Sequence, residues 1–251
     1  MDTEHFMEDK TMTESIWNGF RRIDFEFQGH KAIVVFPEKA NEKRNWMMKM
    51  EYFEAFPKFE IEMLKLGWHL VYVANDNRWC TWESDLDRQK DFADYVIETY
   101  QLAPQFLPVG MSCGGMISIK FAAKYPTYVR CLYVDAPVVN LLSCPAGLGV
   151  AERTLWPDFY NITGITLQEL LGYREHPLDK IPALIENRIP VVMVYGTSDV
   201  TVPFNENGLL LQQAYEKTDI PFLAIGKQYC GHHPHCLEDV TPLIDFVTKF
   251  Y

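Results

Sequence analysis

Residues 106–115 read FLPVGMSCGG, an apolar run that leads into the motif Gly110-Met111-Ser112-Cys113-Gly114. A helix-like stretch follows at residues 114–124. Glycines two positions before and after a serine let a strand and the next helix approach closely without Cβ clashes. The motif therefore predicts a sharp strand-to-helix turn that holds the Ser112 hydroxyl out at the carboxyl end of a buried strand, over the positive end of the helix.

Strand-like and helix-like stretches alternate along the rest of the chain. The apolar, strand-sized runs are residues 20–28, 31–36, 69–74, 106–109, 131–134, 191–195 and 222–225. The helix-like stretches are residues 47–66 with an interruption at Pro57, 85–100, 114–124, 205–216 and 237–250. This alternation is typical of a doubly wound, mostly parallel α/β sheet, which binds ligands beyond the carboxyl ends of its strands.

One segment, residues 138–187, breaks the alternation. It places about fifty residues between two predicted strands, and connections of that length are usually functional or form an inserted subdomain. We predict a single domain over residues 1–251 in which segment 138–187 forms a helical cap above the binding crevice. An ordinary pair of packing helices with a loop is the alternative.

A serine hydroxyl is a weak nucleophile until a base takes its proton, and that base is oriented by an acid. Asp199 follows the apolar run 191–195 and lies after the serine and before the histidines, which is the order expected for this turn. We predict Asp199 as the acid. Asp135, at the end of the run 131–134, is the alternative acid, and residues 75–77 are predicted turn or crevice-rim residues.

Three histidines follow the last predicted strand, and one of them is the predicted base. His232 is preferred because it directly follows a glycine, and His233 and then His235 are the alternatives. The same loop also contains Cys230 and Cys236, so a metal site is a competing interpretation. Paired ligand spacing is missing, and five candidates within seven residues do not easily converge on one ion. We therefore predict no metal.

Catalysis at such a serine also needs two N–H donors for the developing oxyanion. One is predicted to be the backbone N–H of Cys113, the residue after the nucleophile. The other is expected in the loop after the strand 31–36. Pro37 has no N–H, so Glu38 or Lys39 is predicted as the second donor.

These motifs resemble the α/β-hydrolase superfamily over about residues 21–250. The resemblance rests on the Gly-x-Ser-x-Gly-Gly at 110–115, on Asp199 with Val202-Pro203, and on Gly231-His232. It implies an eight-stranded, mostly parallel sheet, a Ser-His-Asp triad and no cofactor. In such a sheet the cap predicted from segment 138–187 would be inserted between strands 6 and 7. Residues 45–47, 52–53 and 231–235 also resemble esterase-like or prolyl-oligopeptidase-like bacterial serine hydrolases. The loop after strand 31–36 departs from the superfamily because it lacks a His-Gly sequence.

The composition of the chain indicates which kinds of partner are unfavourable and which cellular compartment is expected. The chain has 251 residues, 48% of them hydrophobic, and a net charge of −11, so nucleic acid is an unfavourable partner. No apolar run approaches the roughly 20 residues of a membrane span. Residues 1–15 do not read as a secretion signal, and six cysteines in a chain of this length favour free thiols in the cytoplasm.

The sequence thus predicts a serine esterase that cleaves a small-molecule ester through an acyl-enzyme. The alternatives are a small-peptide or amide hydrolase, an acyltransferase, and a non-catalytic protein that uses the same crevice. A length of 251 residues favours the esterase, because peptidases of this superfamily usually carry a large extra domain. The oligomeric state stays open. Five aromatic residues are candidates for lining a substrate pocket or for packing the core: Trp46, Trp79, Trp82, Trp156 and Phe159.

Overall fold

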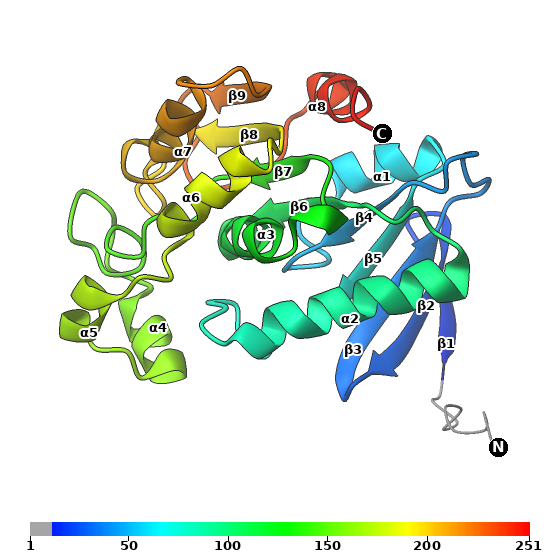
Figure 1. The fold of residues 1–251 in the computed structure, drawn as a ribbon, viewed down its shortest axis with the longest axis horizontal. Helices are drawn as coiled ribbons and strands as arrows, with labels where there is room; N and C mark the ends of the chain where they lie inside the picture. Colours follow the sequence, from blue (N-terminus) through cyan, green and yellow to red (C-terminus); the bar gives the residue numbers. More distant parts are fainter. Residues whose placement is uncertain (1–11) are drawn as a thin grey trace.

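The computed structural model describes residues 12–251, which form one nine-stranded sheet in the order β1-β2-β3-β5-β4-β6-β7-β8-β9 (Figure 1). The strands are β1 (Thr13–Trp17), β2 (Phe20–Phe27), β3 (His30–Phe36), β4 (Trp46–Lys49), β5 (His69–Val73), β6 (Leu107–Met111), β7 (Leu132–Asp135), β8 (Val191–Gly196) and β9 (Phe222–Lys227). The helices are α1 (Lys58–Lys65), α2 (Glu83–Tyr100), α3 (Cys113–Lys124), α4 (Trp156–Thr163), α5 (Leu167–Gly172), α6 (Pro177–Glu186), α7 (Gly208–Tyr215) and α8 (Thr241–Val247).

The predicted doubly wound, mostly parallel sheet is confirmed, with one strand more than expected. From β5 to β9 the neighbouring strands pair in parallel, whereas β1, β2 and β3 pair antiparallel with their neighbours. The expected count of eight strands was wrong because β1 adds a strand at the sheet edge. Only Trp17 of β1 is buried, so its sequence lacks the apolar alternation that marks a strand.

The helix predicted over residues 47–66 was wrong in its first part. Residues Trp46–Lys49 form β4, which pairs with β5 on one side and β6 on the other, and all four are buried. A strand covered on both faces shows no polar-apolar alternation, so periodicity alone cannot distinguish it from a buried helix segment. The helix itself, α1, begins only after Pro57.

Helices cover both faces of the sheet, and a separate apolar core lies on each face. Helices α1 and α8 pack on one face, and α2, α3, α6 and α7 on the other (Figure 1). Neighbouring residues of one strand divide between the two cores: Val34 of β3 belongs to one and Val35 to the other. Within residues 12–251, no helix has the length and apolar character needed to cross a bilayer.

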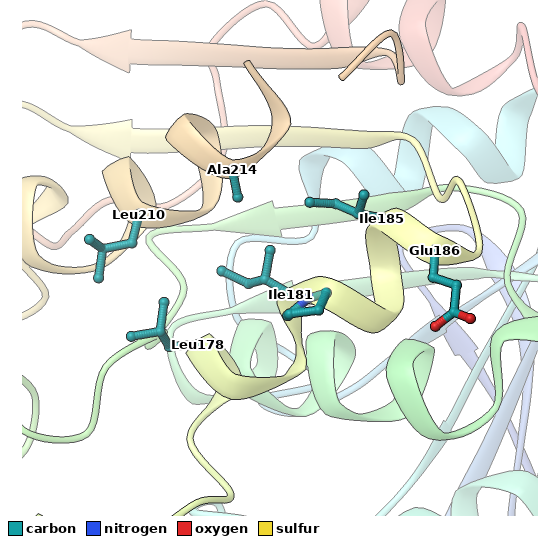
Figure 2. A pocket seen from close by; sticks show the side chains of 7 residues that line it. Leu178, Ile181, Ile185, Glu186, Leu210 and Ala214 are labelled. Atoms are coloured by element: carbon teal, nitrogen blue, oxygen red, sulfur yellow. The ribbon is translucent and has the colours of Figure 1, made fainter. Parts of the chain in front are cut away.

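The segment between β7 and β8 contains α4, α5 and α6. Helix α6 packs against α3 and α7, so it is one of the helices that cover the sheet. An apolar hollow of about 460 Å³ lies between α6 and α7 and is lined mainly by Leu178, Ile181, Ile185, Leu210 and Ala214 (Figure 2). Helices α4 and α5 lie to one side of this layer (Figure 1). A cap over residues 138–187 stays a prediction.

The turn from β6 into α3 leaves no space for side chains at its glycines. A Cβ added to Gly110 would lie 2.2 Å from the carbonyl oxygen of Gly114. A Cβ added to Gly115 would lie 2.6 Å from the Cβ of Pro137, in the loop after β7. Contacts this short require the backbone to move. The close approach of β6, α3 and the β7 loop therefore depends on these glycines.

We expect Gly115→Ala to destabilise the fold, because its methyl group would press on the backbone of Pro137. Overpacking of this kind lowers the free energy of unfolding by about 1–3 kcal/mol. Gly172→Ala is the matched control, since no heavy atom lies within 4 Å of the added Cβ there. Urea denaturation measures both variants. Equal stability of the two variants would contradict the steric account of the turn.

Candidate active site

Ser112 occupies the turn that the sequence predicted, between the last residue of β6 and the first of α3. Its backbone has φ 54° and ψ −118°, a strained conformation for a residue with a side chain. The Ser112 N–H donates to the carbonyl oxygen of Asp135 at 2.9 Å, and its own carbonyl oxygen accepts from the N–H of Val138 at 3.2 Å. These bonds hold the strained residue in place, with 7% of its surface exposed.

The structure brings Ser112, His232 and Asp199 into one hydrogen-bonded chain. The Nδ1 atom of His232 lies 2.7 Å from Oδ2 of Asp199, and its Nε2 atom lies 3.0 Å from Oγ of Ser112. An ionised carboxylate can only accept, so Nδ1 donates to Asp199. In the neutral ring Nε2 is then the acceptor for the Ser112 hydroxyl. This tautomer is the one a base for Ser112 requires.

Asp199 is fixed by the loop that follows β8. Its Oδ1 atom accepts hydrogen bonds from the N–H groups of Thr201 at 2.9 Å and Val202 at 2.8 Å. Burial alone raises the pKa of the Asp199 carboxyl, but the bonds from His232, Val202 and Thr201 outweigh burial and leave the pKa below its ordinary value. Asp199 is therefore an ionised, oriented partner for the imidazole at neutral pH.

The alternative acid, Asp135, contacts a different histidine. Its Oδ1 atom lies 2.9 Å from Nδ1 of His235, and its Oδ2 atom accepts from the N–H of Cys236. Both side chains are nearly fully buried, with 1% of Asp135 and 3% of His235 exposed. A second carboxylate–imidazole pair therefore lies beside the first. It also ties the loop after β9 to the residue whose carbonyl holds Ser112.

The alternative base, His233, has no carboxylate partner among the residues that the structure describes. Its exposed ring stacks on Phe56, with centroids 5.6 Å apart and planes inclined by 17°. Partial burial lowers the pKa of His233, as do the neighbouring rings of His232 and His235. The geometry at Ser112 thus distinguishes His232 from the two histidines that the sequence left as alternatives.

The predicted second oxyanion donors, Glu38 and Lys39, lie at the wrong edge of the sheet. Strand β3 runs antiparallel to β5, so its carboxyl end adjoins the amino end of β5. In agreement, the Lys39 carbonyl lies beside Gly67, just before β5 begins. The prediction failed because a buried apolar run does not reveal the direction of its strand. The other predicted donor, the Cys113 N–H, lies at the start of α3, where helix N–H groups have no intrahelical acceptor.

The loop after β4 reaches the turn instead. A Cβ added to Gly114 would lie 3.3 Å from the backbone nitrogen of Glu51 and 3.2 Å from its Cβ. The N–H of Met50 already donates to the carbonyl of Val109, and the N–H of Tyr52 makes a long bond of 3.4 Å to Glu51 Oε1, so the Glu51 N–H is the first candidate donor in this loop. Sequence analysis missed these residues because it assigned β4 to a helix. The all-apolar segment 46–48 was the signal that could have identified a central strand.

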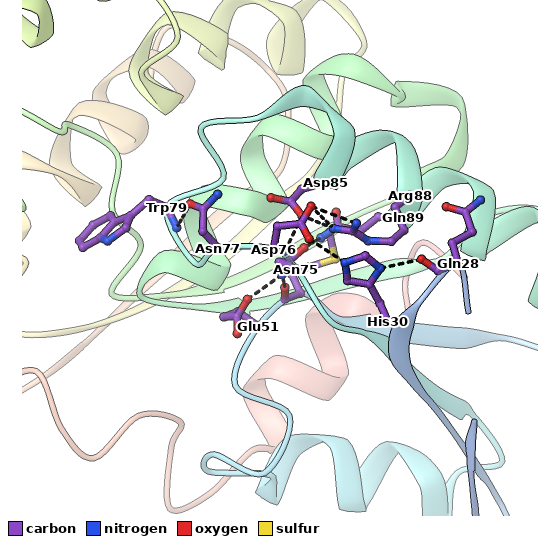
Figure 3. Close-up of polar contacts among 11 residues, drawn as sticks. Gln28, His30, Glu51, Asn75, Asp76, Asn77, Trp79, Asp85, Arg88 and Gln89 are labelled. Atoms are coloured by element: carbon purple, nitrogen blue, oxygen red, sulfur yellow. Dashed lines mark hydrogen bonds and ion pairs between the residues drawn. The ribbon is translucent and has the colours of Figure 1, made fainter. Parts of the chain in front are cut away.

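A polar network holds this loop in place (Figure 3). The Nδ2 atom of Asn75, directly after β5, donates to the Met50 carbonyl at 2.8 Å and to Glu51 Oε2 at 2.6 Å. The side-chain oxygen Oδ1 of Asn75 in turn accepts from Nε2 of Gln89 on α2 at 2.5 Å. Burial raises the pKa of the Glu51 carboxyl, an effect that the bond from Asn75 reduces but does not cancel. The network fixes the loop after β4 relative to α2.

Other members of the network anchor the loop after β5. The Arg88 guanidinium bonds to Asp76 Oδ2 at 3.0 and 3.1 Å and to Asp85, and His30 Nε2 lies 2.6 Å from Asp76 Oδ1 (Figure 3). Asn77 accepts from the N–H of Trp79 at 3.0 Å. Residues 75–77 therefore lie in the connection between β5 and α2, with a bend at Asp76. Most of their side-chain polar atoms bind other parts of the chain, whereas Nδ2 of Asn77 is buried without a partner among the described residues.

Most of the predicted aromatic pocket residues pack in the core. Trp46, Trp79 and Phe159 are fully buried. Trp46, the first residue of β4, stacks on Phe106 with centroids 4.5 Å apart, at the edge opposite Ser112. Trp79 donates to Asp158 of α4 at 2.8 Å and so links that helix to the loop after β5. Of the two roles that the sequence left open, the structure gives these three residues core packing, whereas Trp82 is exposed.

We expect the stabilising contribution of Asp199 to disappear in acid. Its folded-state pKa is lowered, so this contribution is complete above the unfolded-state pKa of about 4 and is lost as the pH falls through the folded-state value. Urea denaturation of the wild type and Asp199→Asn, from neutral to acidic pH, should show a difference in unfolding free energy that shrinks as the pH falls. A difference independent of pH would contradict the lowered pKa.

Comparisons with known proteins locate this fold among known structures. No protein-family profile and no curated sequence matches the chain. Among solved structures, it is similar to a puromycin-hydrolyzing peptidase of Mycobacterium tuberculosis (TM-score 0.64, 13% identity, 81% of this chain and 34% of that one). It is also similar to an S-formylglutathione hydrolase from Agrobacterium tumefaciens (TM-score 0.60, 15% identity, 88% of this chain and 91% of that one). A third similar structure is the Pyrococcus horikoshii acylaminoacyl peptidase (TM-score 0.65, 14% identity, 87% of this chain and 40% of that one).

The similar structures differ in how much of their length this chain covers. The chain spans about a third of the length of the puromycin-hydrolyzing peptidase and most of the length of the S-formylglutathione hydrolase. At 13–15% identity, the shared feature is the fold. Together with the strand order and the turn at Ser112, these likenesses show that the chain has the α/β-hydrolase fold.

Proposed function

We propose that this protein is a serine hydrolase that cleaves carboxylic esters of small or medium-sized substrates through an acyl-enzyme. The observation that carries the proposal is the chain of hydrogen bonds from Ser112 through His232 to Asp199. The three side chains come from loops after β6, β9 and β8, far apart in sequence. Their convergence at one edge of the sheet is the arrangement that nucleophilic catalysis by serine requires.

In this mechanism His232 takes the Ser112 proton while Oγ attacks the ester carbonyl carbon. The carbonyl π pair moves to oxygen and returns as the bond to the alcohol breaks, and His232 gives its proton to the departing alkoxide. Water then attacks the acyl-Ser112 ester with His232 again as base, which releases the acid and restores the serine. Asp199 holds the imidazole tautomer and stabilises the imidazolium formed in each half-reaction.

The oxyanion that forms in each half-reaction needs preorganised donors. The Cys113 N–H at the start of α3 supplies one, and the positive end of the helix adds to its effect. The loop after β4 supplies the second, in place of Glu38 or Lys39, through the N–H of Glu51, or through that of Tyr52 once its long bond to Glu51 Oε1 is released. The bonds from Asn75 keep this loop in position before a substrate arrives.

An ester is favoured because an alcohol is a better leaving group than an amine. Ser112 is 7% exposed and the His232 side chain 11%, and we expect small acyl groups to reach the hydroxyl most readily. Two similar structures are described as peptidases, which keeps amide hydrolysis as the second candidate. A series of p-nitrophenyl esters of increasing chain length, assayed beside aminoacyl p-nitroanilides, separates the two candidates by kcat/KM.

The proposed substrate is a small molecule, and the proposed compartment is the cytoplasm. All six cysteines lie in the described part of the chain and carry free thiols, and five of them are buried. Free thiols persist where the surroundings are reducing. An acyltransferase would use the same acyl-enzyme but pass the acyl group to an acceptor alcohol instead of water. Product analysis with added alcohols distinguishes it from a hydrolase.

We expect Ser112→Ala to reduce ester hydrolysis by about 10³-fold or more and to abolish labelling by a fluorophosphonate probe, because no other side chain carries the proposed nucleophile. Ser198→Ala is the matched control, since Ser198 is exposed and lies beside Asp199. It should keep both activity and labelling. Normal hydrolysis or labelling by Ser112→Ala, with an unchanged melting temperature, would refute the proposed nucleophile.

The two buried aspartates should differ in their effect on the reactivity of Ser112. Asp199→Asn removes the acceptor that fixes the His232 tautomer, so the rate of fluorophosphonate labelling should fall by up to about 10⁴-fold. Asp135→Asn leaves the His232–Asp199 bond intact and should lower that rate far less, while lowering the melting temperature. A greater loss of labelling in Asp135→Asn would exchange the proposed roles of the two acids.

A further inference from the structure

Three imidazoles crowd together at the rim of the proposed active site. The rings of His232, His233 and His235 have centroids 4.8, 4.9 and 4.9 Å apart, and their planes are inclined to one another by 61°, 81° and 89°. One ring nitrogen of each residue lies within 4.8 Å of those of the other two. In the sequence, the close spacing of these residues argued against their convergence on one ion. In the fold, the three histidine rings nevertheless lie close together.

The ring spacing and plane angles of this cluster are close to those of three imidazoles around a tetrahedral metal ion. With zinc–nitrogen distances of about 2.0–2.1 Å, rings at the tetrahedral angle have centroids about 5 Å apart and steeply inclined planes. Their ligating nitrogens are then about 3.3 Å apart, closer than the separations of up to 4.8 Å in the cluster, so metal binding requires the rings to turn toward a common point. His233 is exposed, which gives an ion a path from solvent to the cluster.

Two of the rings are already oriented as metal ligands usually are. Nδ1 of His232 is held by the Asp199 carboxylate, and Nδ1 of His235 by the Asp135 carboxylate. Metal-bound histidines commonly donate one ring N–H to a carboxylate, which fixes the tautomer and raises the basicity of the other nitrogen. Both rings thus keep Nε2 for a ligand. On His232 this nitrogen now faces the Ser112 hydroxyl at 3.0 Å.

We propose that His232, His233 and His235 form a reversible inhibitory site for a divalent transition metal ion such as Zn²⁺. Inhibition rests on the proposed function, because a metal bound to Nε2 of His232 removes the base that deprotonates Ser112. The binding of the ion does not depend on that function. The fourth coordination position is left for water or the Ser112 hydroxyl, as expected for a site with three protein ligands.

The test combines a spectroscopic readout with an activity readout on the full chain. Co²⁺ added to the protein should give the visible absorption of a tetrahedral site, and Zn²⁺ should displace it. Zn²⁺ should also inhibit ester hydrolysis and slow fluorophosphonate labelling of Ser112, and EDTA should restore both. His233→Ala should weaken Co²⁺ binding and Zn²⁺ inhibition at least about 10-fold. Even the substitution of a residue that only hydrogen-bonds to a metal ligand lowers metal affinity about 10–100-fold.

Cys230→Ser is the matched control, because Cys230 lies in the same loop but outside the three-histidine cluster. It should keep the Co²⁺ spectrum and the Zn²⁺ inhibition. An active enzyme that Zn²⁺ does not inhibit, or an inhibition lost in Cys230→Ser but kept in His233→Ala, would overturn the metal site. A Co²⁺ spectrum that depends on His233 in a protein without hydrolase activity would support the metal site and refute only the proposed function.

Discussion

The steric closure of the turn between β6 and α3 is the constraint on which the rest of the site depends. Gly110 lets the strand approach the carbonyl of Gly114, and Gly115 lets the helix approach Pro137. Between these two contacts Ser112 has φ 54°, and its hydroxyl lies 3.0 Å from Nε2 of His232. A wider turn would relax the serine into the helix, and its hydroxyl would lose the position from which it reaches His232.

Two carboxylates at the ends of neighbouring strands hold the loop after β9, which contains the three histidines. Asp199, after β8, fixes the ring of His232, whereas Asp135, at the end of β7, fixes His235 and the N–H of Cys236. The backbone carbonyl of Asp135 also accepts from the N–H of Ser112. One buried residue therefore sets the distance between the proposed nucleophile and the loop that carries its base. The deep burial of Asp135 is compensated because each carboxylate oxygen accepts a hydrogen bond.

The sequence predicted those parts of the fold and site that follow from local geometry. The turn at Ser112 and the sheet class could be derived because glycine spacing and strand–helix alternation have direct steric causes. The loop after β4 could not be derived, since the central strand Trp46–Lys49 has no apolar periodicity and β3 runs opposite to β5. Among the three histidines, the preceding glycine pointed to His232, and the structure places this residue against Ser112. The pairing of His235 with Asp135 could not be derived, because it is a long-range contact that leaves no local signal.

The polar network around Asn75 fixes the loop after β4, although its burial is energetically unfavourable. Burying Glu51 beside the turn is unfavourable, as the raised pKa of its carboxyl indicates. Asn75 offsets part of this cost and, with Gln89, fixes the backbone of the loop after β4. Donors aimed at a developing oxyanion are effective when they need no reorganisation during the reaction. The buried network thus fixes the loop after β4 already in the folded protein. In this way a loop without a His-Gly motif can hold an N–H group in a fixed direction.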